Sequence, residues 1–173
     1  VAWGLHHTDH APGSTSHRTR LVIRSCARLS SYLPQRIICC SNATLAVHAE
    51  IGYDRSRMLV IPNGFDISIF RPESDARNSL RRELGVPEDT QLVAMLGRYH
   101  PQKDHRNFLD AARILAAGAP RAHFVLCGDE VDWNNRELVD LVTERGIRDR
   151  VHLLGQRDDV PRILAALDAG STS

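Results

Sequence analysis

Residues 91–117 read QLVAMLGRYHPQKDHRNFLDAARILAA, and a strand signal, a glycine and a helix signal follow one another in this stretch. Residues 91–96 form an almost continuous apolar run, which is typical of a strand buried on both faces of a parallel sheet. In residues 104–117, Phe108, Leu109 and Ala112 recur at helical spacing and define an inner face. The stretch therefore predicts a strand, a loop that begins at Gly97, and a helix.

The same alternation extends in both directions along the chain. Helices of about ten residues between short apolar strands indicate parallel sheets with right-handed crossovers and flanking helices, which is the α/β class. We expect ligands at the carboxyl-terminal edge of such sheets. Further strands are predicted at residues 1–5, 36–40, 57–61, 122–127 and 150–154, and helices at residues 19–33, 42–51, 76–84, 134–145 and 158–167.

The composition excludes several classes of protein. In 173 residues, 22 Lys and Arg face 21 Asp and Glu, and 42% of the residues are hydrophobic, so the chain is neither disordered nor strongly basic. We therefore expect no nucleic acid partner. No apolar run reaches the roughly 18 residues that a membrane span needs. The chain starts at Val1 and stops after DAGSTS, so we expect it to be an internal fragment of a longer protein.

The four cysteines and nine histidines do not form a metal-binding motif. No CxxC pair, HExxH or paired Cys/His spacing is present, so we expect buried thiols in a reducing compartment and no metal site.

The loop after residues 91–96 carries the strongest functional signal. Gly97 allows a tight turn, and Arg98 and Lys103 place two cations beside the start of a helix, where free N–H groups also favour anions. A phosphate or diphosphate is the expected guest, although the loop matches neither GxxxxGK[ST] nor GxGxxG. The alternative is a surface loop in which both cations pair only with Asp104 or solvent. The spacing of the residues does not decide between a phosphate site and such a surface loop.

Two other loops contain candidate residues. Asn63-Gly64 follows a strand and predicts a turn with a positive φ at Gly64, which by itself needs no function. Gly155 ends the strand at residues 150–154 at the ligand edge, and Asp158 or Asp159 is expected to cap the next helix.

No catalytic residue is identified. His6 and His7 follow the first strand, but neither receives a catalytic role, and no GxSxG motif or pair of catalytic carboxylates is present.

Four segments in order resemble family 4 of the glycosyltransferases, in particular bacterial enzymes of lipopolysaccharide, capsule and exopolysaccharide synthesis. They are IPNGFD (61–66), GRYHPQKDHRNFLDAARIL (97–115), HFVLCGD (123–129) and RVHLLGQRDDVPRILAALD (150–168). The resemblance implies the GT-B fold, with two Rossmann-like lobes, sugar transfer with retention from a nucleotide-diphosphate sugar to a glycan or lipid-linked acceptor, and no metal cofactor. It also implies a cytoplasmic enzyme, with peripheral association at the cytoplasmic face of a membrane left open.

The resemblance assigns site residues and lobes in this sequence. The family's donor-diphosphate loop matches Gly97, Arg98 and Lys103. Its interlobe turn near the donor matches Asn63 and Gly64. The loop that holds the nucleotide base matches Gly155, Gln156 and Arg157. Residues 1–70 correspond to the carboxyl-terminal part of the acceptor lobe, residues 71–90 to a linker and the start of the second lobe, and residues 91–173 to the first part of the donor lobe.

The family's catalytic histidine and its Glu-x7-Glu segment have no counterpart in this sequence, so the catalytic residues stay unknown and the fragment by itself is expected to be inactive. The alternative function is a non-catalytic nucleotide- or phosphate-binding Rossmann-like module. A dinucleotide oxidoreductase fits poorly, because the glycine fingerprint and its ribose-binding acid are missing.

Overall fold

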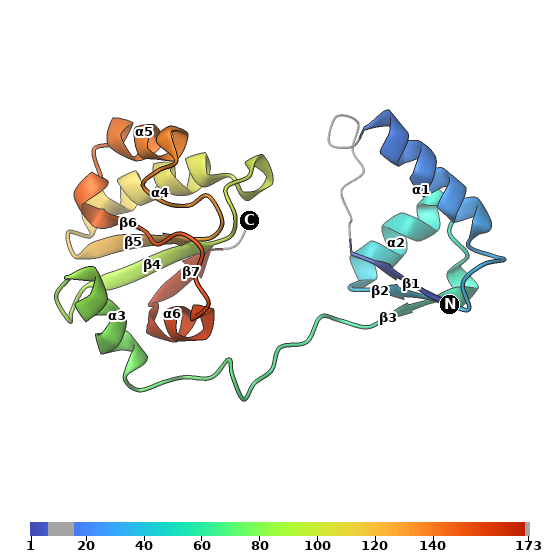
Figure 1. The fold of residues 1–173 in the computed structure, drawn as a ribbon, viewed down its shortest axis with the longest axis horizontal. Coiled ribbons are helices and arrows are strands. Elements are labelled where there is room, and N and C mark those ends of the chain that lie inside the picture. The colour runs from blue at the N-terminus through green and yellow to red at the C-terminus, as the bar shows by residue number, and fades with distance from the viewer. Residues whose placement is uncertain (7–15, 172–173) are drawn as a thin grey trace. The chain divides into compact units, whose positions relative to one another are not determined.

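The computed structural model of the chain describes residues 1–6 and 16–171. The chain divides into two compact units, Val1–Phe65 and Asp66–Ser173, and each is described by itself (Figure 1). The division falls after Phe65, whereas the resemblance predicts that the first lobe ends at residue 70.

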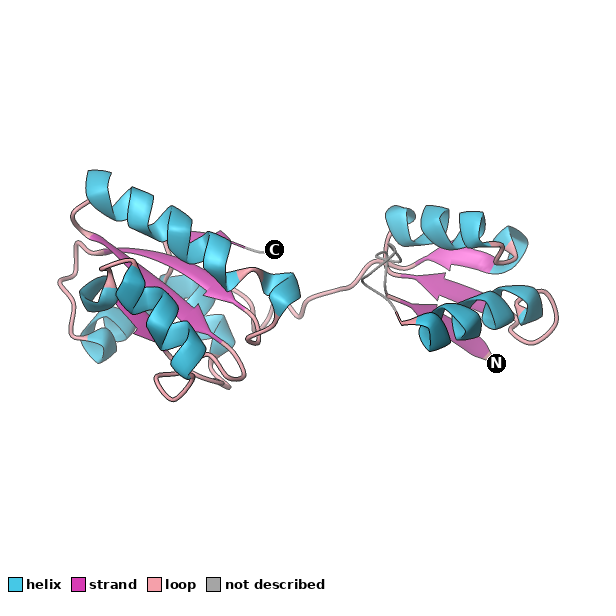
Figure 2. Cartoon of the chain, turned by 90° about the horizontal axis from the view of Figure 1, so that it is seen from above, coloured by secondary structure: helices cyan, strands magenta, loops and turns pink. Residues whose placement is uncertain are grey.

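The first unit is a three-stranded parallel sheet covered on one face by two helices (Figure 2). Ile37 and Cys39 are completely buried and form its core with Ala27 and Tyr53. The strands, in the order β1-β2-β3, are β1 (Ala2–Leu5), β2 (Arg36–Cys39) and β3 (Met58–Val60), and the helices are α1 (His17–Leu29) and α2 (Asn42–Ile51).

Serine residues fix both ends of α1. The Ser16 side chain accepts a hydrogen bond from the Thr19 amide at 3.2 Å and begins the helix. The hydroxyl of the buried Ser30 donates to the Ala27 carbonyl at 2.6 Å and accepts from the Asp54 amide at 2.8 Å. The helix therefore ends at Leu29, earlier than the predicted residue 33, because Ser30 binds a distant part of the backbone.

The second unit is a four-stranded parallel sheet with helices on both faces (Figure 1). Helices α4 (His105–Gly118) and α5 (Arg136–Glu144) cover one face, and α3 (Ala76–Leu84) and α6 (Val160–Ala166) cover the other. The strands, in the order β6-β5-β4-β7, are β4 (Gln91–Leu96), β5 (Ala122–Cys127), β6 (Val151–Leu153) and β7 (Ala169–Ser171).

The middle of the second sheet is buried on both sides. Phe124 and Leu126 of β5 pack in the cluster under α4 and α5, while Val125 and Cys127 pack in the cluster under α3 and α6. This alternation is what a strand between two helical layers requires. The prediction of an α/β fold with parallel sheets and flanking helices is confirmed.

A buried arginine ties the start of the second unit to its end. The Arg81 side chain is completely buried in α3, and its guanidinium donates to the Thr90 carbonyl at 2.7 and 2.9 Å and to the Ala166 carbonyl at 3.0 Å. It also pairs with Asp168 at 2.7 Å, and Asp168 accepts from the Leu92 amide at 2.8 Å. Helix α3 is therefore an integral part of this unit.

The structure corrects two expectations about local geometry. The prediction of a turn with a positive φ at Gly64 is wrong, because residues 61–66 run without turn structure and Gly64 is not among the glycines with positive φ. Strand β7 is missing from the sequence prediction. Its three residues pair with Val93, Ala94 and Met95 of β4, so the pairing, and not the apolar pattern, defines this strand.

Candidate functional site

Three loops meet at the carboxyl-terminal edge of the second sheet. The Gly97 amide donates to the Cys127 carbonyl at 2.9 Å, and the Gly128 amide donates to the Gly155 carbonyl at 2.9 Å. Main-chain hydrogen bonds therefore join the loops that follow β4, β5 and β6. The edge is the place where open parallel sheets bind ligands.

Gly128 allows the backbones of two of these loops to touch. Its φ is +157°, and a Cβ at this position would lie 2.2 Å from the Gly97 carbonyl oxygen and 2.8 Å from the Arg98 amide nitrogen. No side chain fits there. Gly128 is not among the site residues predicted from the sequence, although its place directly after an apolar strand is a signal that could identify it.

The Lys103 side chain packs against the same loop. A Cβ on Gly97 would lie 3.3 Å from Cδ and from Cε of Lys103, so the aliphatic part of the lysine covers the glycine. Lys103 ends the short helix η2 (Pro101–Lys103), and Asp104 then adopts a left-handed conformation with a φ of 49°. The Asp104 carboxylate caps α4 by accepting from the Asn107 amide at 3.3 Å.

Arg98 lies on the same loop and is exposed. The loop is fixed beside it, because the Tyr99 amide donates to the Asp129 carbonyl at 2.8 Å. Gly97, Arg98 and Lys103 therefore lie together at the start of α4, a helix of 14 residues whose dipole favours anions there. Two cations and a helix N-terminus form an arrangement that can bind a phosphate group.

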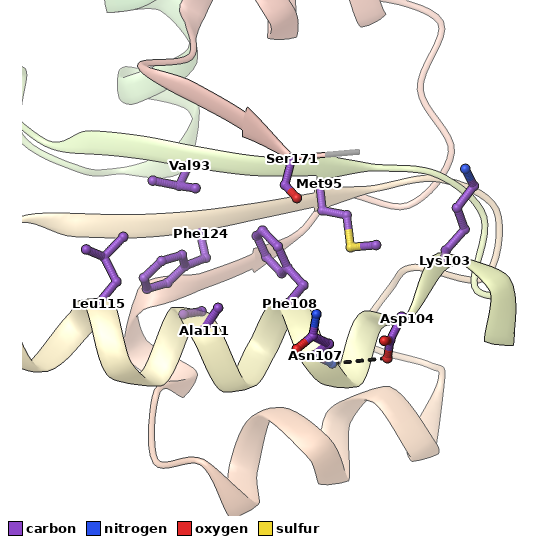
Figure 3. Close-up of a pocket in the computed structure, with 11 residues that line it drawn as sticks. Val93, Met95, Lys103, Asp104, Asn107, Phe108, Ala111, Leu115, Phe124 and Ser171 are labelled. Atoms are coloured by element: carbon purple, nitrogen blue, oxygen red, sulfur yellow. Dashed lines mark hydrogen bonds between the residues drawn. The ribbon is translucent and has the colours of Figure 1, made fainter. Parts of the chain in front are cut away.

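A cavity of about 260 Å³ extends from this loop along the inner side of α4 (Figure 3). Lys103, Asp104 and Asn107 lie at one end of it, and the remaining wall is mostly apolar. The lining residues are Val93, Met95, Lys103, Asp104, Asn107, Phe108, Ala111, Ala112, Leu115, Phe124 and Ser171.

His105 is a buried residue of this region that the sequence analysis did not identify. It is 3% exposed at the first turn of α4, and its ring lies 5.1 Å from that of Tyr99. Neither ring nitrogen makes a hydrogen bond of ordinary geometry among the described residues, although the Gly97 backbone lies close enough to act on the ring. Burial lowers the pKa of His105, so the imidazole under the loop is neutral at pH 7.

The loop after β6 contains Gly155, Gln156 and Arg157, which were predicted to hold a nucleotide base. Gly155 has a φ of +66°, Gln156 is exposed, and Arg157 is partly buried. The Arg157 guanidinium binds Asp159 at 2.8 and 2.9 Å and Glu83 at 2.7 Å. The side chain of Arg157 therefore holds this loop to α3, and the base-binding role stays a prediction.

Asp159 does not cap α6 through its side chain, contrary to the simplest expectation from the sequence. Its carboxylate binds Arg157 and, at 2.6 Å, Arg162, which also binds Glu83 at 2.6 Å. Hydrogen bonds from Arg157 and then Arg162, against the effect of burial, hold the pKa of Asp159 well below its usual range. The four side chains form a closed ion-pair network beside the site.

The other predicted residues lie in the first unit. Asn63 and Gly64 are exposed, and His6 at the end of β1 is exposed as well, while His7 lies outside the described residues. All four cysteines are free thiols. In residues 1–6 and 16–171, no group of three or more His, Cys, Asp and Glu side chains is arranged to hold a metal ion.

Two family models match the chain, one over each part. The family model described as "Glycosyl transferases group 1" matches residues 76–170, and a model described as "Glycosyltransferase Family 4" matches residues 1–69. The chain is 30% identical over 168 residues to the Escherichia coli UDP-Gal:alpha-D-GlcNAc-diphosphoundecaprenol alpha-1,3-galactosyltransferase, and it covers 43% of that protein.

Solved structures show a similar fold. The crystal structure of Anabaena HepE in complex with UDP and glucose has a TM-score of 0.82 and 28% identity, over 99% of this chain and 46% of that chain. WaaG, a glycosyltransferase involved in lipopolysaccharide biosynthesis, has a TM-score of 0.73 and 18% identity, over 96% of this chain and 49% of that one, and it shows the fold alone.

The chain thus spans less than half of the length of these relatives. The GT-B type of fold and the resemblance to glycosyltransferases are confirmed. On the match over residues 76–170, the chain belongs to the glycosyl transferases group 1 family.

Proposed function

We propose that this chain is part of a retaining glycosyltransferase that moves a sugar from a nucleotide-diphosphate sugar to a glycan or a lipid-linked acceptor. The observation that carries this proposal is the arrangement of Gly97, Arg98 and Lys103 at the start of α4, where Gly128 permits the close approach of two loops. Complexes of HepE with UDP and with UDP-glucose support a uridine nucleotide as the donor class.

The second unit holds the donor in this proposal. Loss of the nucleoside diphosphate leaves negative charge on the leaving group, and fixed cations with a helix dipole stabilise such charge. Arg98 and Lys103 would bind the diphosphate, and the loop of Gly155, Gln156 and Arg157 would contact the base. We expect no metal cofactor, so addition of a chelator to a transfer assay should leave the rate unchanged.

The acceptor belongs to bacterial surface polysaccharide synthesis in this proposal, and the transfer takes place in the cytoplasm. The E. coli relative is named as acting on a sugar attached to diphosphoundecaprenol, and WaaG is described as part of lipopolysaccharide biosynthesis. The role of Asn63 and Gly64 near the donor stays a prediction.

Calorimetric titration with UDP and UDP-glucose, together with a sugar-transfer assay, tests this function. Binding of UDP that is lost in Arg98→Gln and Lys103→Gln supports the donor site, and transfer by a longer chain that contains this sequence supports the enzyme. UDP binding with neither transfer nor donor hydrolysis in such a longer chain would instead indicate a nucleotide-binding module. Absence of UDP binding would refute the assignment of the site.

A further inference from the structure

His105 is buried beneath the loop of residues 97–103, which we call the diphosphate loop. Its side chain is at the first turn of α4, and both ring nitrogens are shielded from solvent without a hydrogen bond of ordinary geometry to any described residue. A buried polar group that stays unpaired is unfavourable, and an apolar side chain would avoid this cost. Packing alone therefore does not account for an imidazole at this position.

The imidazole lies against the diphosphate loop at two residues. Burial lowers the pKa of His105, and the Gly97 backbone opposes this effect, as a carbonyl oxygen close to a ring N–H does. The ring of Tyr99 lies 5.1 Å from that of His105. A neutral imidazole has one N–H donor, so the ring can attract the Gly97 carbonyl. The two residues that it contacts are those on either side of Arg98.

The three successive amides of this part of the loop differ in their hydrogen bonds. The Gly97 amide donates to the Cys127 carbonyl at 2.9 Å. The Tyr99 amide donates to the Asp129 carbonyl at 2.8 Å. The Arg98 amide between them has no acceptor among the described residues. The backbone is thus fixed on both sides of one N–H that is available to a ligand.

The contact with Gly128 gives the direction of this N–H. A Cβ on Gly128 would lie 2.2 Å from the Gly97 carbonyl oxygen and 2.8 Å from the Arg98 amide nitrogen, so the oxygen is the nearer atom. The peptide between Gly97 and Arg98 is trans, and its N–H points in the opposite direction to its carbonyl. The Arg98 N–H therefore points away from Gly128.

We propose that His105 is a positioning residue of the diphosphate loop, whose ring N–H attracts the Gly97 carbonyl and so turns the Arg98 amide toward a phosphate oxygen of the donor. A main-chain donor fixed in this way acts together with the side chains of Arg98 and Lys103 and needs no rearrangement when the anion arrives. The identity of the anion rests on the proposed function, whereas the role of His105 rests on the geometry of the loop.

Amide hydrogen exchange tests the positioning without any nucleotide. In His105→Phe a ring of similar shape donates no hydrogen bond, so the Tyr99 amide should exchange about tenfold or more faster than in the unchanged chain. His105→Asn and His105→Gln each place a side-chain N–H near a different one of the two ring nitrogens. One of the two should restore slow exchange and the other should not, because only one nitrogen faces Gly97.

His48 provides the matched control. It is as deeply buried as His105, at 3% exposure, but it lies in the first unit and its Nδ1 is 2.9 Å from the Thr44 carbonyl oxygen. His48→Phe should leave both the exchange of the Tyr99 amide and the binding of UDP unchanged, and thermal unfolding should show which variants are folded. Should His105→Phe fail to fold, the Asn and Gln variants decide, since equal exchange in these two would overturn the inference.

Calorimetry with UDP and with uridine connects the loop to the donor. His105→Phe should weaken UDP binding about tenfold and leave uridine binding unchanged, because only UDP carries the diphosphate. In nuclear magnetic resonance spectra, UDP should shift the Arg98 amide signal of the unchanged chain much more than that of His105→Phe. Affinities for UDP and uridine that fall together would overturn the inference, and so would an unchanged affinity for UDP.

The two experiments separate failure of this inference from failure of the proposed function. Absence of UDP binding to the unchanged chain would refute the donor site, while the exchange of the Tyr99 amide would still measure whether His105 positions the loop. If the unchanged chain binds UDP, and His105→Phe matches it both in UDP affinity and in exchange of the Tyr99 amide, only the inference about His105 fails.

Discussion

The backbones of Gly97 and Gly128 touch at the carboxyl-terminal edge of the second sheet, where a Cβ on Gly128 would lie 2.2 Å from the Gly97 carbonyl oxygen. The contact sets the position of the loop that carries Arg98 and Lys103. Any side chain at position 128 must push this loop away or break the hydrogen bond from the Gly97 amide to the Cys127 carbonyl. A residue without a side chain thus sets the position of the loop proposed to bind the diphosphate.

The first prediction concerns Gly128→Ala. The clash with backbone atoms, added to an unfavourable φ, should destabilise the second unit by about 2 kcal/mol or more and weaken UDP binding at least about tenfold. Gly146→Ala is the matched control, because Gly146 also has a positive φ but a Cβ there meets nothing within 4 Å. The control should lose about 1–2 kcal/mol of stability and no UDP affinity. UDP affinity unchanged in Gly128→Ala would contradict the role of this contact.

The second prediction concerns the two cations of the loop. Arg98→Ala and Lys103→Ala should each lose about 1.5–3 kcal/mol of charge-assisted hydrogen bonding to the diphosphate, which is roughly ten- to a hundred-fold in UDP affinity. Calorimetry with UDP and with uridine separates this effect from contacts to the base, because uridine has no diphosphate. If both variants bound UDP as the unchanged chain does, the assignment of the diphosphate loop would be wrong.

The third prediction concerns Arg81. Replacement by methionine leaves Asp168 and the Thr90 and Ala166 carbonyls without their buried partner, so the free energy of unfolding should fall by about 3–5 kcal/mol. Arg77 binds the same carboxylate but is 44% exposed, and Arg77→Ala should cost about 1 kcal/mol or less. Urea unfolding measures the free energy of unfolding of both variants. Equal losses in the two would show that the burial of Arg81 does not determine how much its ion pair stabilises the unit.

The fourth prediction concerns pH. Nδ1 of His123 lies 2.9 Å from Nε2 of His152 on the neighbouring strand. Burial, and then the charge of His123, lowers the pKa of His152 to about 4 from a usual value of 6.5. The unfolded chain therefore takes up a proton before the folded one does, so stability should be constant above pH 6.5 and fall as the pH drops toward 4.

His152→Gln should reduce this loss of stability between pH 6.5 and pH 4, although part of it should persist, because burial also lowers the pKa values of His105 and His123. Thermal unfolding across this pH range measures the effect. An identical dependence on pH in the variant would show that His152 does not titrate in this way.

The sequence predicts the central strands of the second sheet and the residues at their ends. Each of the three apolar runs that end at Gly97, Gly128 and Gly155 has the pattern of a buried strand, and the glycine marks where the following loop begins. Hydrophobicity alone is therefore enough to predict these strands and loops. Strand β7 could not be predicted in this way. Ala169, Gly170 and Ser171 have low β-propensity, and they form a strand because β4 offers them a partner.

The contacts made by polar side chains also cannot be predicted from the local sequence pattern. Arg157 lies in a loop that suggests a ligand, yet its guanidinium binds Glu83, which is far away in the sequence. The sequence predicts that Arg81 lies on the exposed surface of a helix, as arginines usually do, but its side chain is completely buried. Such roles depend on which segments the fold brings together, and a window along the sequence does not contain that information.

The bond between Arg81 and Asp168 has a consequence for the order of events during synthesis. The two residues are 87 positions apart, and β7 follows directly after Asp168, so the partner of the buried guanidinium and the edge strand are translated together. Until residue 168 leaves the ribosome, β4 lacks its neighbour β7 and Arg81 lacks its counter-ion. The second unit should therefore reach its native packing late, in a single step, rather than grow gradually as its helices emerge.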